Sequence, residues 1–153
     1  MSADKILEVA GLAVQSDLLR AQGRRLVFTN GCFDIFHMGH IESLRKSKSF
    51  GDILVVGLNS DESISKLKGP ERPVMDLHNR LAIIESLEFV DFVIVFDKKT
   101  PYAILKALKP DVYVKGAEYR GKYLEGSDYA GKIEYIEFET MNHQLEQPII
   151  FKN

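Results

Sequence analysis

Short apolar runs alternate along the chain with longer segments in which apolar residues recur at helical spacing. The apolar runs predict buried strands at residues 26–29, 53–58, 92–96, 112–114 and 133–138. The helical spacing and its capping residues predict helices at residues 4–22, 41–50, 61–67, 76–87 and 100–109. The run at 53–58 is almost uniformly apolar, which is typical of a parallel strand covered on both faces.

Strands that alternate with helices predict a parallel sheet with right-handed crossovers. The expected fold class is therefore α/β: a single doubly wound, Rossmann-like domain with a five-stranded parallel sheet flanked by helices. We expect one domain over residues 1–153, with an N-terminal helix over 1–24, a core over 25–138 and a tail over 139–153. Ligands of such sheets bind beyond the carboxyl ends of the strands, where the strand order reverses. Residues that directly follow a strand are therefore the first candidates for a functional site.

Composition narrows the class of protein. The 153 residues are 45% hydrophobic and 27% charged, enough apolar material for one buried core, and the net charge of −2 gives no reason to expect nucleic-acid binding. Cys32 is the one cysteine, so neither an intrachain disulfide nor a cysteine cluster for a metal is expected. No signal-peptide pattern and no apolar run of about 20 residues occurs, so we expect a cytoplasmic protein without a membrane partner.

The segment after the first predicted strand carries the clearest chemistry. It reads Thr29-Asn30-Gly31-Cys32-Phe33-Asp34-Ile35-Phe36-His37-Met38-Gly39-His40. A turn between a strand and a helix N-terminus offers backbone N–H groups to an anion, and Gly31 and Gly39 allow a ligand to approach the backbone. His37 and His40 are three residues apart, so they share one face of the helix start and can donate hydrogen bonds to phosphate oxygens. The alternative is a strand-turn-helix corner with two surface histidines.

Gly31-Cys32-Phe33-Asp34 and His37-Met38-Gly39-His40 resemble the H-x-G-H signature of the cytidylyltransferase-like nucleotidyltransferases. The longer form Thr29–Asp34 is most similar to the heptose 1-phosphate adenylyltransferase branch, the adenylyltransferase part of ADP-heptose synthase. The resemblance implies a catalytic set of His37, His40, Lys48 and Arg80. It implies nucleotide binding by Thr29, Asn30, Gly31, Cys32, Phe33, Asp34, Gly39, Lys115, Gly116 and Glu118, and a substrate loop with Arg72 and Tyr119.

Each of these further residues also has a plainer interpretation. Lys48 matches a lysine that related enzymes direct at the triphosphate, but it also fits a solvated basic helix face. Arg80 follows an Arg72-Pro73-Val74 loop that resembles the family's R-P-V loop, and the alternative is an exposed helix arginine. Residues 115–119 resemble the K-G-G-D-Y turn of the heptose branch, with Glu118 in place of aspartate. Cys32 is expected to be a small, partly buried residue and not a nucleophile.

The tail departs from the family pattern. Relatives follow the last strand with a Ser/Thr-rich segment that helps to bind the nucleotide, whereas here only Thr140 is a candidate and Pro148 interrupts a long helix. The departure leaves the nucleotide pocket without one of its usual elements.

The resemblance implies a nucleotidyltransferase that joins a nucleoside monophosphate to a sugar or polyol phosphate and releases pyrophosphate. ATP and heptose 1-phosphate, giving ADP-heptose, are the favoured substrates. Two alternatives stay open: a CTP-dependent enzyme acting on glycerol 3-phosphate or a similar alcohol phosphate, and a non-catalytic nucleotide-binding module. Mg²⁺ is implied as a companion of the triphosphate, with no dedicated metal motif, and related proteins are often homodimers.

Overall fold

The computed structural model describes residues 5–137 and contains one parallel sheet with helices on both faces. Its strands are β1 (Ile6–Leu7), β2 (Leu26–Gly31), β3 (Ile53–Asn59), β4 (Phe92–Phe96), β5 (Val112–Gly116) and β6 (Lys132–Ile136). Its helices are α1 (Leu12–Ala21), α2 (Met38–Lys48), α3 (Asp61–Lys68), α4 (Leu77–Glu85) and α5 (Tyr102–Leu108). The predicted α/β class and doubly wound arrangement are confirmed, while the tail with Thr140 lies outside the described residues.

The strand order is β1-β4-β3-β2-β5-β6, with every neighbouring pair parallel. From β2 the chain adds β3 and β4 on one side, and then crosses to place β5 and β6 on the other side. The strand order therefore reverses between β2 and β5, which is where a doubly wound sheet forms its ligand crevice.

The prediction of five strands was one short. The predicted helix over 4–22 begins only at Leu12, after Gly11 in a left-handed conformation (φ 86°), and Ile6–Leu7 forms the edge strand β1. Ile6 and Leu7 pair with Val93 and Ile94 of β4. A two-residue strand is too short for a periodic signal, and its partner lies far along the sequence, so the helical spacing dominated the prediction.

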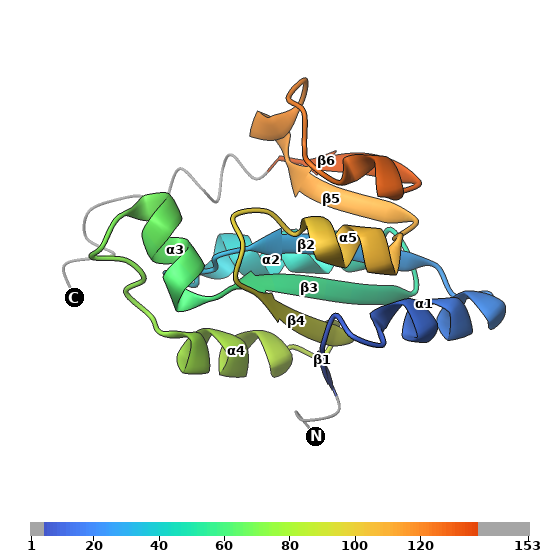
Figure 1. Cartoon of the computed structure of the whole chain (residues 1–153), viewed down its shortest axis with the longest axis horizontal. Coiled ribbons are helices and arrows are strands. Elements are labelled where there is room, and N and C mark those ends of the chain that lie inside the picture. Colours follow the sequence, from blue (N-terminus) through green and yellow to red (C-terminus); the bar gives the residue numbers. More distant parts are fainter. Residues whose placement is uncertain (1–4, 138–153) are drawn as a thin grey trace.

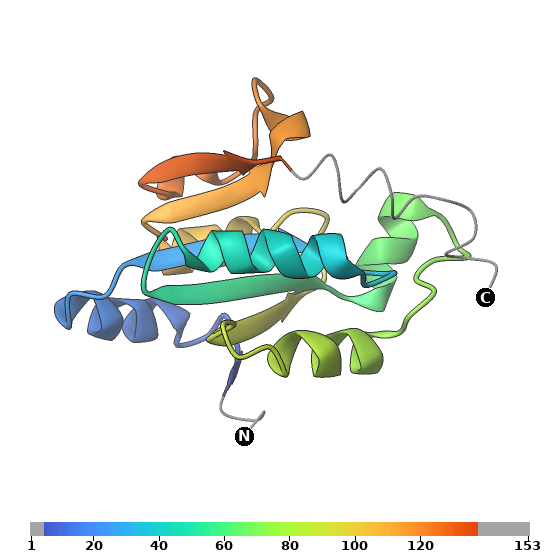
Figure 2. The same ribbon diagram turned by 180° about the vertical axis from the view of Figure 1, so that it is seen from behind.

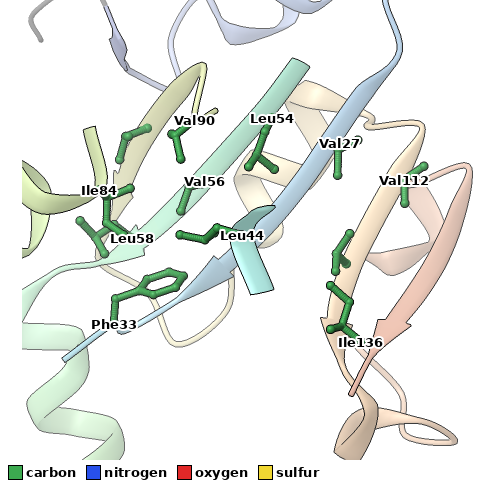
Figure 3. Packing of buried hydrophobic residues seen from close by; sticks show 12 residues of the cluster. Val27, Phe33, Leu44, Leu54, Val56, Leu58, Ile84, Val90, Val112 and Ile136 are labelled. Carbon is green, nitrogen blue, oxygen red and sulfur yellow. The ribbon is translucent and has the colours of Figure 1, made fainter. Parts of the chain in front are cut away.

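Each face of the sheet has its own apolar cluster. Helices α1 and α5 cover one face, where Leu12 and Leu105 pack with Phe28 (Figure 1). Helix α2 crosses the opposite face, seen from behind in Figure 2, and Leu44 of α2 packs there with Ile84 of α4. Figure 3 shows this second cluster, in which alternate residues of β3 direct their side chains toward the helices.

Aspartates immediately before three strands hold the amino edge of the sheet. Asp52 accepts a hydrogen bond from the Arg25 N–H (2.8 Å), and Asp111 accepts one from the Leu26 N–H (2.8 Å). Asp91 accepts one from the N–H of Leu54, the second residue of β3 (2.7 Å). Backbone donors at the strand starts are thus satisfied by charged acceptors, which fixes the stagger of neighbouring strands.

We predict that Asp111→Ala lowers the free energy of unfolding by about 1–3 kcal/mol, because it leaves the Leu26 N–H at the start of β2 without its acceptor. Asp111→Asn keeps an oxygen acceptor and should cost less. Urea unfolding followed by far-ultraviolet circular dichroism measures both, since the chain has no tryptophan. An Asp111→Ala protein with the wild-type unfolding midpoint would contradict this role.

Candidate functional site

A cavity of about 730 Å³ lies at the carboxyl edge of the sheet, between the ends of β2 and β5. This is the switch point of the strand order, and the volume is in the range of small-molecule sites. Predicted site residues that line it are Thr29, Asn30, Gly31, Cys32, Phe33, Asp34, His37, His40, Arg72, Lys115, Gly116, Glu118 and Tyr119. The structure thus brings together the H-x-G-H turn, the substrate loop and the turn after β5.

His37 and His40 are fixed by reciprocal hydrogen bonds with the backbone at the start of α2. His37 is the N-cap residue, and its Nδ1 accepts from the Gly39 N–H (3.0 Å). Nδ1 of His40 accepts from the His37 N–H (3.2 Å), so each imidazole satisfies a helix-start donor. The two rings stack with centroids 4.0 Å apart. Gly39 itself does not line the cavity and contributes its N–H to this arrangement.

Aromatic residues support the His40 ring from behind. Phe33 meets it edge to face at 5.3 Å, and Phe36 lies 5.2 Å from it. Phe33 adopts a left-handed backbone conformation (φ 50°), which is strained for a bulky residue. Gly31 permits this turn, since a Cβ at that position would lie 3.0 Å from the Phe33 ring. The strained turn thus places the Phe33 ring against the His40 imidazole.

Burial, followed by repulsion from His37 and Lys68, lowers the pKa of His40 to about 4. His40 is therefore a neutral imidazole at neutral pH. A neutral imidazole has one N–H donor and one acceptor nitrogen. Because Nδ1 is the acceptor here, the proton belongs on Nε2.

Cationic side chains surround the histidines. Lys115, at the end of β5, has its Nζ 4.3 Å from the Tyr119 ring centroid and 5.8 Å from that of Tyr113. Burial lowers the pKa of Lys115, against the opposing effect of the Glu118 charge. Among the described residues, Lys115 forms no ion pair with a carboxylate. Aromatic faces hold its ammonium group. An anionic ligand would therefore stabilise the charged form of Lys115.

Several lining residues were missed by the sequence analysis. They are Asn59 at the end of β3, Lys68 at the end of α3, Lys99 and Thr100 after β4, and Glu125 in the segment between β5 and β6. Asn59, Lys99 and Thr100 could have been found by applying the rule of residues that follow a strand to every strand. Lys68 and Glu125 carry no local signal, because only the folded chain brings them to the cavity.

Arg80 is buried beneath the cavity and does not line it. The residue is 1% exposed. Its Nη1 donates to the carbonyl oxygens of Cys32 (3.0 Å) and Asn59 (2.6 Å), and its Nη2 pairs with Asp61. Arg80 therefore ties the ends of β2 and β3 together. The structure does not place it with the predicted site residues that line the cavity, and its burial excludes an exposed helix arginine. Burial raises the pKa of the neighbouring Cys32 thiol, which disfavours a thiolate nucleophile.

The structure does not bring Lys48 to the cavity. Its Nζ lies 2.6 Å from Asp91 Oδ2 and 2.7 Å from the Asp52 carbonyl oxygen, at the amino edge of the sheet. Helix α2 has 11 residues and, at 1.5 Å per residue, a length of about 16 Å. The histidines at its start and Lys48 at its end consequently lie at opposite edges of the sheet.

Asp34 is almost fully buried at the cavity wall and faces the substrate loop. Arg72 Nε lies 2.5 Å from Asp34 Oδ2, and the backbone N–H groups of Val74 and Met75 donate to Oδ1 at 2.8 and 2.9 Å. Burial alone would raise the pKa of Asp34, but the hydrogen bonds from Met75 and Arg72 outweigh it and hold the pKa below its usual range. The carboxylate is therefore ionised and already engaged on both oxygens.

Within residues 5–137, no three His, Cys, Asp or Glu side chains lie together as a metal site would require. No helix in this range is long and apolar enough to cross a bilayer.

Comparisons with known proteins identify relatives of the chain. Residues 28–141 match the family described as Cytidylyltransferase-like. The bifunctional protein HldE of Wolinella succinogenes is 47% identical over 137 residues, which is 90% of this chain and 29% of that protein. HldE of Campylobacter fetus is 52% identical over 124 residues, 80% of this chain and 27% of that protein. The chain thus spans less than a third of the length of these curated relatives.

Solved structures give the same fold. The lipopolysaccharide core biosynthesis protein of Thermoplasma volcanium superposes with a TM-score of 0.62 at 31% identity, covering 76% of this chain and 99% of that chain. Pantoate-beta-alanine ligase of Francisella tularensis superposes with a TM-score of 0.56 at 15% identity, covering 86% of this chain and 66% of that chain, a likeness of fold alone. Cavity, histidine turn and sequence matches lead to one assignment: the chain belongs to the cytidylyltransferase-like family.

Proposed function

We propose that the chain transfers a nucleoside monophosphate from a nucleoside triphosphate to the phosphate of a sugar phosphate, with release of pyrophosphate. One observation carries the proposal: both histidines use Nδ1 to accept backbone N–H groups, which assigns the ring proton of each to Nε2. Two N–H donors are thereby pre-organised at the cavity, and the low pKa of His40 keeps that ring uncharged at neutral pH. Donors fixed in advance are what a transition state with growing phosphate charge requires.

The reaction needs no general base. A phosphate oxygen of the acceptor, anionic near neutral pH, forms a bond to the α-phosphorus, while the bond from that phosphorus to the β-phosphate oxygen breaks and pyrophosphate leaves with the electron pair. His37 and His40 stabilise the α-phosphoryl oxygens, while Lys115, Lys68 and Arg72 line the same cavity and neutralise the two polyanions. Mg²⁺ is implied as a companion of the triphosphate and would help to neutralise its charge; among the described residues no three His, Cys, Asp or Glu side chains lie together to hold it.

The favoured substrates are ATP and heptose 1-phosphate, with ADP-heptose as product. The likeness to HldE proteins and to a lipopolysaccharide core biosynthesis protein supports a sugar phosphate acceptor. The match to the Cytidylyltransferase-like family favours a second candidate, a CTP-dependent transfer to glycerol 3-phosphate or another alcohol phosphate. A cytoplasmic location and a homodimer also belong to this proposal and rest on the resemblance.

We predict pyrophosphate release when ATP is offered with heptose 1-phosphate, and little with CTP or with glycerol 3-phosphate. His37→Ala and His40→Ala should each lower kcat by about a hundred- to a thousandfold, the loss expected for one fixed donor to a developing oxyanion. His78→Ala, an exposed histidine on α4, is the matched control and should retain wild-type turnover.

A preference for CTP would move the chain to the second candidate. Tight nucleotide binding in calorimetry without turnover for any substrate pair would identify a non-catalytic nucleotide-binding module, and would overturn the proposed transfer.

The protonation of His40 gives an independent prediction. Long-range ¹H–¹⁵N NMR spectra should show a neutral ring with its proton on Nε2 from pH 8 to 5, and titration only near pH 4. His40→Gln identifies the signal. A ring that titrates near 6.5, or that carries its neutral-state proton on Nδ1, would contradict the assignment.

The lowered pKa of His40 also makes the stability of the fold depend on pH. Because the pKa of His40 is about 4 in the folded protein and about 6.5 in the unfolded chain, its contribution is complete above pH 6.5 and is lost as the pH falls toward 4. His40→Gln should therefore show a flatter fall of the free energy of unfolding across this window.

A further inference from the structure

The Asp34 side chain is 2% exposed, and both of its oxygens accept hydrogen bonds from other groups of the protein. Every partner it has among the described residues belongs to the short segment 72–75: the Arg72 guanidinium and the N–H groups of Val74 and Met75. An ionised carboxylate that accepts from a guanidinium and two backbone donors forms strong, charge-assisted hydrogen bonds. Because both oxygens already accept hydrogen bonds from the protein, the geometry of this carboxylate suits a task other than ligand binding.

The same loop segment is held from its other side. Nε of Arg80 donates to the Met75 carbonyl oxygen at 2.9 Å, while Met75 N–H donates to Asp34. Arg80 also holds the Cys32 carbonyl oxygen, two residues before Asp34. The Met75 N–H is therefore tied directly to the turn that leads into the two histidines, and the Met75 carbonyl oxygen is tied to it through Arg80.

The hydrogen bond from Arg72 to Asp34 orients the Arg72 side chain at the cavity. Its Nε is bound by Asp34, its carbonyl oxygen accepts from the Ser65 hydroxyl (2.5 Å), and its side chain lines the cavity. A guanidinium has five N–H donors in a planar fork, so fixing Nε fixes the direction of the others. Arg72 is thus pre-organised to receive phosphate oxygens.

We infer that Asp34 is a positioning residue, which latches the Arg72-bearing loop onto the histidine turn, and that it does not itself bind nucleotide. The inference rests on the proposed function for the phosphate role of Arg72, but the latch itself is a property of the ligand-free protein. Asp34 acts through Arg72, so removal of either partner should release the same loop.

The test is limited trypsin digestion of the whole chain without substrate, with mass spectrometry to follow cleavage between Lys68 and Gly69. Asp34→Asn keeps an oxygen acceptor for the backbone donors but sets an amide N–H₂ against Arg72 Nε. We expect Asp34→Asn and Arg72→Ala each to speed this cleavage several-fold, and the double variant to be no faster than the single variants, because both changes break one contact. Glu71→Gln, an acid-to-amide change at an exposed site in the same loop, should be cleaved at the wild-type rate.

Turnover gives the second readout. Asp34→Asn should lower kcat/KM by about ten- to a hundredfold, the range for losing a hydrogen bond between charged groups, and should add nothing to the loss in Arg72→Ala.

Wild-type cleavage rates in Asp34→Asn and Arg72→Ala, or effects that multiply in the double variant, would overturn the latch. If Asp34→Asn does not fold, Arg72→Lys decides, since lysine keeps the charge but lacks Nε: unchanged cleavage overturns the latch and faster cleavage supports it. A wild-type chain without turnover would defeat the proposed function alone, since the digestion reports the latch independently.

Discussion

The site depends on one exchange of hydrogen bonds at the start of α2, in which two imidazoles satisfy backbone donors that a helix leaves open. This exchange does two things at once: it begins the helix, and it assigns the imidazole protons to Nε2. A local folding requirement and a chemical requirement are therefore met by the same atoms. The low pKa of His40 follows from its packing against Phe33 and Phe36, which removes it from water.

Buried charges in the cavity wall and behind it keep this arrangement in place. Arg80 joins the ends of β2 and β3, and Asp34 joins the histidine turn to the loop that carries Arg72. Each of these charges is paired and hydrogen-bonded, as burial of an ionised group demands. Asp34 lines the cavity and also holds its wall together, whereas in the proposed reaction His37 and His40 donate to the ligand, so the segment 29–40 contains residues of both kinds.

The sequence predicted what local pattern determines. A strand, a glycine-containing turn and a helix start are contiguous, so His37 and His40 could be placed at the sheet edge from their spacing alone. Lys48 and Arg80 required knowledge of distant partners: Asp91 draws Lys48 to the far edge, and the Cys32 and Asn59 carbonyl oxygens draw Arg80 inward. Strand β1 was missed for the same reason, since its two residues gain their structure only by pairing with β4.

The most direct test of the account is a crystal structure of the protein with a non-hydrolysable ATP analogue whose α,β-bridging oxygen is replaced by methylene. We expect Nε2 of both His37 and His40 within hydrogen-bonding distance of the nucleotide's phosphate oxygens, with Lys115 and Arg72 on the same polyphosphate. Phosphates bound away from the two imidazoles, or Nε2 atoms directed away from the phosphates, would contradict the central claim.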